Sequence, residues 1–321
     1  MGTYAHVVVV GGRSGLARQA QRRVGDLERR WSRFLPHSEV STLNRMDGVA
    51  LPVSADTKLL VERAVEGWRL SGGAFDPTVL GPVTRAGYDR SFDELVASPG
   101  PGRSALDLGA AGIEVDDATV RIPAGTGFDP GGIGKGLAAD LVCEEMLASG
   151  AEGVCVNLGG DVRVSGTGPD GEAWAIAVEH EWTSTPVALV GLSAGAVATS
   201  TTLRRCWNVP GAGIRHHLID PQTGLPSDTD VTSATVVAGA AWLAEVLAKA
   251  VLLRGWAAAF DILGGTGAEG LVVDDGGRVA ATPGLAAYLG TARPPGTISR
   301  TRRTDGPLAR LKVAAASGGP Q

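Results

Sequence analysis

The chain has 321 residues, of which 44% are hydrophobic and 20% charged, and its formal net charge is −5. This is the composition of an ordinary globular protein that is long enough to bury a real core. The acidic balance argues against nucleic acid as a partner, because such binding needs a concentrated basic surface. The three cysteines form no Cys-x-x-Cys pair, so neither a disulfide framework nor a structural zinc site is expected.

The sequence also indicates where the protein works. No apolar run is long enough to cross a bilayer. The N-terminus lacks the basic region and apolar core of a signal peptide. We therefore expect a cytoplasmic protein that does not insert into a membrane.

The first part of the chain predicts one strand and two helices. A β-branched run over 6–10 predicts the strand, and apolar residues at three- and four-residue spacing predict an amphipathic helix over 16–34. The glycines between them lack the spacing of a dinucleotide-binding turn. Small polar residues predict a loop over 36–44. Ser54 is expected to cap a second helix over 58–70.

A glycine-rich segment over 127–136 is the most unusual stretch of the sequence. It contains Asp129 and Lys135 and continues into a helical pattern over 137–147. Glycines let backbone groups lie against a ligand, and a helix N-terminus attracts anions. These features favour a phosphate site, with Lys135 adding a point charge. The alternative is a tight loop with a surface lysine.

The second part mixes strands and helices without strict alternation, which indicates an α+β protein. A helix is expected over 239–253, and a closing hairpin joins 271–273 to 279–281. The other expected strands lie over 114–122, 153–164, 173–179, 186–192 and 233–238. The composition of 291–321 predicts a flexible tail, so the folded domain is expected over 1–290.

Seven short motifs occur along the chain in the order in which one family carries them. They are Met1-Gly2-Thr3, Trp31–Phe34 with Ser38–Asn44, Gly73–Thr78, Asp129–Gly136, Val156–Asp161, Ala198–Ser200 and His217–Gly224. Together they resemble the ApbE-like FAD:protein FMN transferases, the flavin transferase family. The resemblance spans Met1 to about Leu289, and the run His-Leu-Ile-Asp-Pro-Gln-Thr-Gly from His217 is its most specific part.

This resemblance implies a fold and an activity. The fold would be a two-lobed, T-fold-like α+β domain with mixed or antiparallel sheets, flanking helices and a ligand cleft between interleaved lobes. The activity would be transfer of FMN from FAD to a threonine hydroxyl of an acceptor flavoprotein, with release of AMP. Attack on a pyrophosphate phosphorus needs neutralised phosphate oxygens, a positioned alcohol and a proton acceptor.

The resemblance also implies site residues at the matching positions. The flavin and adenosine contacts would come from Met1, Phe34, Ala74, Phe75, Asp76 and Ile219. Asp129 and Lys135 would lie near the pyrophosphate, and His217 would handle a proton, since a histidine pKa suits work near neutrality. Simpler interpretations stay open, because Asp76 could be a turn former, the phenylalanines core residues and His217 a satisfied histidine. The pair of histidines places His217 near the surface.

The pattern departs from the family at its magnesium site. The Gly132 carbonyl matches one family ligand, but Glu245 and Lys249 stand where the family has an aspartate and a threonine, before Gly255. An ammonium group has no lone pair to offer a metal. Either Glu245 and Lys249 form a helical ion pair, or Lys249 points into the cleft in the metal's place, held by Glu245.

Magnesium is therefore doubtful on the sequence alone. Two other functions stay open for the same reason. One is an FAD pyrophosphatase that releases FMN and AMP, and the other is a non-catalytic flavin-binding protein.

Overall fold

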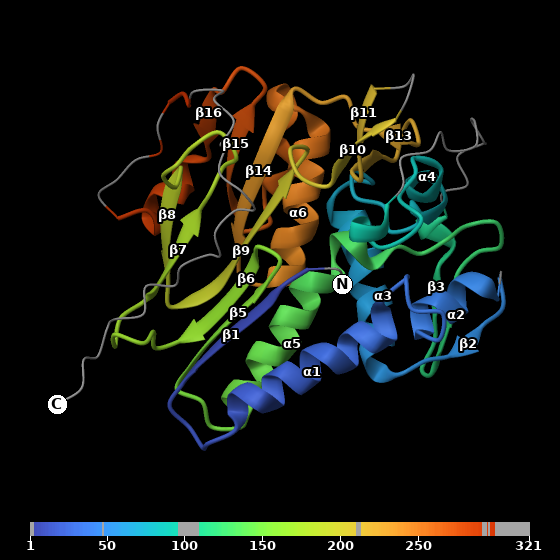
Figure 1. Ribbon diagram of the computed structural model, residues 1–321, viewed down its shortest axis with the longest axis horizontal. Helices are drawn as coiled ribbons and strands as arrows, with labels where there is room; N and C mark the ends of the chain where they lie inside the picture. The colour runs from blue at the N-terminus through green and yellow to red at the C-terminus, as the bar shows by residue number, and fades with distance from the viewer. Residues whose placement is uncertain are drawn as a thin grey trace.

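The computed structural model describes residues 3–46, 48–95, 109–209, 213–290, 294 and 296–298. A seven-stranded sheet runs through it in the order β1-β5-β6-β9-β14-β15-β16 (Figure 1). Every neighbouring pair in this sheet is antiparallel. The strands are β1 (Ala5–Val10), β5 (Gly153–Leu158), β6 (Asp161–Gly166), β9 (Ala194–Thr201), β14 (Val231–Ala238), β15 (Glu269–Asp274) and β16 (Val279–Ala281).

Both faces of this sheet are covered, and the side-chain alternation of the strands explains how. Helices α5 (Gly134–Ala148) and α6 (Ala241–Arg254) cover one face, and the hairpin of β7 (Trp174–Val178) and β8 (Ala188–Leu192) covers the other (Figure 1). Successive residues of a strand point to opposite faces. Accordingly Val236 packs with the helices, while Val237 packs with the hairpin. Strand β14 is buried along its whole length.

Four helices stand beside α5 and α6 in the other part of the molecule (Figure 1). They are α1 (Leu16–Trp31), α2 (Glu39–Arg45), α3 (Ala55–Leu70) and α4 (Leu80–Arg85). A three-stranded sheet has the order β2 (Leu51–Pro52), β4 (Thr119–Arg121) and β3 (Glu114–Val115). Strand β10 (Cys206–Val209) pairs with β11 (Gly213–His216). Strand β12 (Ile219–Asp220) pairs with β13 (Leu225–Pro226). Short 3-10 helices lie at Phe92–Glu94, Ala110–Gly112, Pro130–Gly132, Trp256–Ala258, Asp261–Leu263 and Pro283–Tyr288.

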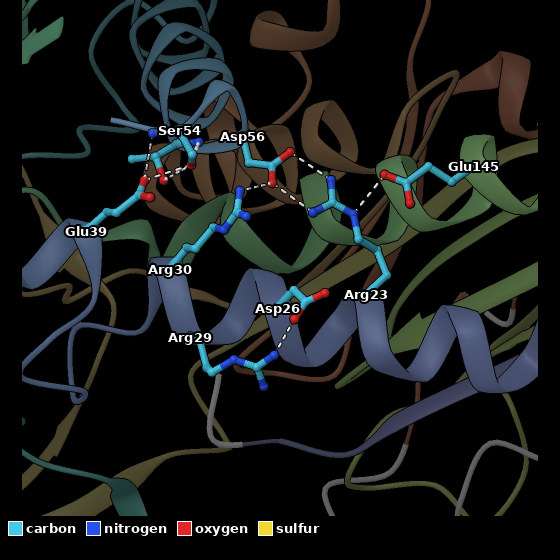
Figure 2. Close-up of polar contacts among 9 residues, drawn as sticks. Arg23, Asp26, Arg29, Arg30, Glu39, Ser54, Asp56 and Glu145 are labelled. Atoms are coloured by element: carbon cyan, nitrogen blue, oxygen red, sulfur yellow. Dashed lines mark hydrogen bonds and ion pairs between the residues drawn. The ribbon is translucent and has the colours of Figure 1, made fainter. Parts of the chain in front are cut away.

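Arg23 of α1 joins three of these helices (Figure 2). Its guanidinium donates two hydrogen bonds of 2.7 Å to Asp56 of α3 and one of 2.7 Å to Glu145 of α5. Arg30, two turns further along α1, donates to the same Asp56 carboxylate at 2.6 Å. The hydrogen bonds to Asp56, which burial opposes and the one to Glu145 reinforces, raise the pKa of Arg23. Figure 2 also shows the exposed pair of Arg29 and Asp26 on α1.

Helices α5 and α6 cap one another. The Asp140 carboxylate of α5 accepts hydrogen bonds from the first two amides of α6, Ala241 at 2.8 Å and Trp242 at 2.9 Å. In return, Glu245 of α6 accepts a hydrogen bond of 2.8 Å from the Gly136 amide in the first turn of α5. A carboxylate at a helix N-terminus satisfies amides that have no partner within the helix. The two helices are therefore locked in register at the end that carries the glycine-rich segment.

Most sequence predictions of single elements are confirmed, and one is wrong. Ser54 caps α3, accepting from the Thr57 amide at 3.3 Å, and the late hairpin pairs as expected. The segment over 36–44 is not a loop throughout, because α2 begins at Glu39. Ser38 caps it and accepts from the Ser41 amide at 3.0 Å. The first helix ends at Trp31, before Phe34.

The predicted α+β class with antiparallel sheets is confirmed. The predicted boundary at 290 and the flexible tail stay predictions, because most of 291–321 lies outside the described residues. Within the described part of the chain, the helices are all too short or too polar to cross a bilayer.

Candidate active site

Two adjoining hollows open next to the N-terminus of α5. The aromatic hollow is lined by Trp31, Phe34, Phe75, Tyr88 and several aliphatic side chains. The polar hollow is lined by Asp161, Glu179, Glu181, Arg204 and the hydroxyl residues 199–201. The residues common to both are Gly131, Lys135, Arg205, His217 and Lys249. Basic side chains therefore gather where the two hollows meet.

The structure brings most of the predicted site residues to this place. Those that line the aromatic hollow are Phe34, Ala74, Phe75, Asp76, Asp129, Lys135, His217 and Ile219. Glu245 lines the polar hollow. Gly132 lies against Lys249, so that a Cβ built on it would stand 2.2 Å from the lysine Nζ. Met1 lies outside the described residues.

Lys135 has two carboxylate partners, Asp161 at the start of β6 and Glu245 of α6. Burial opposes its charge, but the two carboxylates outweigh burial and raise the pKa of its ammonium. Burial also raises the pKa of the Glu245 carboxyl, with Lys135 opposing and Asp161 adding to the rise. Lys135 is thus a fixed cation at the hollow rather than the surface lysine of the simpler interpretation.

Two glycines of the segment, Gly132 and Gly136, make room for other protein groups, whereas Gly131 and Gly134 line the aromatic hollow. A Cβ on Gly136 would lie 2.3 Å from the Ala241 carbonyl oxygen, so this glycine permits close contact between α5 and α6. A Cβ on Gly132 would meet Lys249 and, at 2.9 Å, the Phe75 ring. The amides of Gly131 and Gly136 already donate to Asp129 and Glu245, each at 2.8 Å. The expected row of free amides for a phosphate is therefore wrong at these two positions.

Asp129 and Arg33 join the glycine-rich segment to the aromatic wall. The Arg33 Nε lies 3.6 Å from Asp129 Oδ1, and its guanidinium stands 4.2 Å from the Phe34 ring centroid and 4.7 Å from that of Tyr88. It also donates to the Tyr88 carbonyl at 2.9 Å. The Tyr88 ring in turn lies 5.9 Å from that of Trp207. Stacking on aromatic rings fixes the guanidinium plane.

Sequence reasoning missed Arg33, Tyr88 and Arg205 as site residues. Arg33 stands inside a quoted motif between aromatic residues, which was a usable signal. Tyr88 and Arg205 carry no such signal, because only the fold brings their distant segments to the hollow.

Asp76 is a turn former as well as a lining residue. Its Oδ1 accepts from the Thr78 amide at 2.7 Å and from the Thr78 hydroxyl at 2.5 Å. Burial raises the pKa of this carboxyl, although both hydrogen bonds oppose the rise. The carboxylate therefore holds the loop that carries Phe75 to the hollow.

His217 is half-buried, between the surface position that the histidine pair suggested and the core. Its Nδ1 is buried and has no hydrogen-bond partner among the described residues, and its ring meets Tyr88 edge-on at 6.4 Å. Burial, with Lys249 and Arg205 adding to it, lowers its pKa well below the usual value. The neighbouring His216 is the satisfied histidine, since its Nε2 lies 3.0 Å from the Ser227 carbonyl oxygen. The surroundings of His217 thus favour the neutral form of its ring, which is the form that accepts a proton.

The residues at the family's magnesium positions do not fit a divalent cation. One oxygen of Glu245 meets Lys135 and the other accepts from Gly136. The predicted ion pair between Glu245 and Lys249 is wrong, because no carboxylate in the described part of the chain lies within 4 Å of the Lys249 ammonium. The idea that Glu245 holds Lys249 is wrong for the same reason. Nowhere among the described residues do three histidine, cysteine or acidic side chains gather as metal ligands.

Comparisons with known proteins identify the family. A family model described as the ApbE family matches residues 1–272. An FAD:protein FMN transferase of Treponema pallidum is 30% identical over 272 residues, which cover 77% of this chain and 74% of that protein. Its counterpart in Vibrio cholerae is 28% identical over 252 residues, covering 75% and 73%.

Solved structures show the same fold. The crystal structure of the ApbE protein of Thermotoga maritima matches with a TM-score of 0.80 at 27% identity, over 89% of this chain and 96% of that one. The flavin transferase ApbE of Vibrio cholerae matches with a TM-score of 0.77 at 24% identity, over 90% and 96%.

Proposed function

The chain belongs to the ApbE family, and on that premise we propose that it is an FAD:protein FMN transferase. It would transfer FMN from FAD to a threonine hydroxyl of an acceptor flavoprotein. The free cysteines Cys143, Cys155 and Cys206 support a reducing compartment, the cytoplasm, as its place of work.

The observation that carries this proposal is the cationic junction between the two hollows. FAD is two ring-bearing halves joined by a diphosphate, and here two hollows meet at Lys135, Lys249 and Arg205. A diphosphate at the junction would be neutralised by charge-assisted hydrogen bonds. The aromatic hollow would hold one planar ring system against Phe34 and Tyr88.

The chemistry needs little more than this arrangement. The threonine oxygen forms a bond to the FMN phosphorus, and the bond from that phosphorus to the AMP oxygen breaks. The proton of the hydroxyl goes to a base, for which neutral His217 is the candidate. Fixed cations at the diphosphate stabilise the charge that develops on the leaving AMP.

Incubation of the purified protein with FAD, with and without an acceptor flavoprotein, tests the function. We expect AMP only when the acceptor is present, together with flavin fluorescence that stays on the acceptor through denaturing electrophoresis. Release of AMP and FMN without the acceptor would instead identify an FAD pyrophosphatase. Tight FAD binding without AMP in either sample would identify a flavin-binding protein.

A further inference from the structure

We propose that the ammonium group of Lys249 contacts the diphosphate of FAD directly, and that FAD binding by this protein needs no divalent cation. This inference rests on the proposed function, because it needs FAD in the cleft. It concerns a place where the sequence departs from the family pattern.

The position of Lys249 is fixed from two sides. It lies on α6 one turn after Glu245, and its side chain crosses to the glycine-rich segment, where Gly132 has no side chain to exclude it. A Cβ on Gly132 would stand 2.2 Å from Nζ and 2.8 Å from Cε. The Nζ also lies 5.9 Å from the Phe75 ring centroid. The lysine therefore ends at the junction and lines both hollows.

The Lys249 ammonium forms no ion pair with a carboxylate among the described residues. Lys135 has two carboxylate partners, whereas within the described residues no carboxylate comes within 4 Å of the Lys249 ammonium. Burial lowers the pKa of the Lys249 ammonium, and Asp129, whose charge opposes this most, is already engaged by the Gly131 amide and by Arg33. A cation withdrawn from water without a partner is costly. An anion that enters the cleft would supply the missing partner.

The same arrangement disfavours a metal ion. Both oxygens of Glu245 are engaged by Lys135 and Gly136, and Lys249 offers no lone pair. A divalent cation next to Gly132 would also stand beside this ammonium and be repelled by it. Oxygen donors that magnesium needs are thus replaced here by a positive charge.

The test compares FAD affinity with and without magnesium in three proteins. These are the wild type, Lys249→Met and, as a control, Lys58→Met. Lys58 is a half-exposed lysine on α3 that pairs with Glu62 at 3.3 Å. The dissociation constant of FAD is followed by flavin fluorescence in EDTA and in saturating MgCl₂ at equal ionic strength. We expect wild type and Lys58→Met to bind equally in the two buffers. Lys249→Met should bind at least about tenfold more weakly in EDTA, as for a lost hydrogen bond to a charged group.

Two results would overturn the inference alone. One is wild-type affinity that collapses in EDTA and returns with magnesium, and the other is unchanged affinity of a folded Lys249→Met protein. If the wild type bound FAD in neither buffer, the proposed function would fall as well.

A second variant tests whether Gly132 positions the lysine. Gly132→Ala should weaken FAD binding in the wild-type background, because its methyl group displaces the ammonium. In the Lys249→Met background the same substitution should have a smaller effect, because the contact with the ammonium is gone and the one with the Phe75 ring remains. Equal losses in both backgrounds would contradict the placement of Lys249 against Gly132.

Discussion

Lys135 and Glu245 form an ion pair that joins the first turn of α5 to the middle of α6. The other oxygen of Glu245 accepts from the Gly136 amide at 2.8 Å. A protein carboxylate thus accepts the hydrogen bond of an α5 amide that we expected, from the sequence, to bind a phosphate. The positive charge left for a ligand comes from side chains at the junction, above all from Lys249.

Removal of the Lys135 charge should destabilise the fold. Lys135→Met would leave Glu245 and Asp161 buried beside each other, and Asp161 is only 3% exposed. Loss of one partner from such a group costs about 3–5 kcal/mol. Urea unfolding should show this loss in the free energy of unfolding. The double variant Lys135→Met/Glu245→Gln should recover part of this loss, because it also removes the unpaired Glu245 charge. A double variant as unstable as Lys135→Met would show that the unpaired Glu245 charge is not the cause of the loss.

The sequence predicted the framework well because local patterns determine it. The β-branched run over 231–238 and the cap at Ser54 are read from neighbouring residues alone. Helix α2 was missed because its polar residues resemble a loop, although Ser38 is a good cap. The family motifs brought Asp129 and His217 to the same hollow, as expected.

What the sequence could not provide is the identity of groups that meet across the fold. The sequence does not distinguish a glycine that lies against a ligand from one that lies against a helix. Gly136 lies against α6. Likewise Glu245 is four residues from Lys249 but pairs with Lys135, which lies 110 residues away. Helical spacing permits the first pair, and only tertiary packing selects the second.

Gly136 should be intolerant of a side chain, whereas Gly134 should accept one. A Cβ on Gly136 would lie 2.3 Å from backbone oxygen of Ala241, while one on Gly134 would meet Pro130 Cβ at 3.4 Å. Gly136→Ala must separate α5 from α6, at a cost of about 3 kcal/mol or failure to fold. Gly134→Ala should change stability by less than about 1 kcal/mol. Thermal unfolding of both variants checks the contrast, and equal stabilities would contradict the close helix contact.

The helix junction at Arg23 should matter more than a surface ion pair on the same helix. The Arg23 side chain is 17% exposed and pairs with residues of two other helices, whereas Arg29 is 66% exposed and pairs with Asp26 on its own helix. Arg23→Met should lower the free energy of unfolding by about 2 kcal/mol, because Asp56 loses two hydrogen bonds. Arg29→Met should change it by less than about 0.5 kcal/mol. Denaturant titration of both variants distinguishes the two roles, and equal effects would show that Arg23 does not bind the helices together.

His217 should titrate below the usual histidine range in the free protein and rise when its cationic neighbours are removed or neutralised. Burial lowers its pKa, and Lys249, Arg205, His216 and Lys135 add to this effect. The neutral form, which accepts a proton, is therefore retained as the pH falls below 6.5. Because the unfolded chain binds that proton near pH 6.5, this histidine makes the free energy of unfolding fall as the pH drops below about 6.5.

NMR titration of the ring protons in wild type and Lys249→Met checks the assignment, with His217→Gln identifying the signal. We expect the His217 pKa to be higher in Lys249→Met, and higher again in wild type with FAD bound, since a diphosphate offsets the cations. A His217 pKa that is the same in all three states would show that the histidine does not sense the junction.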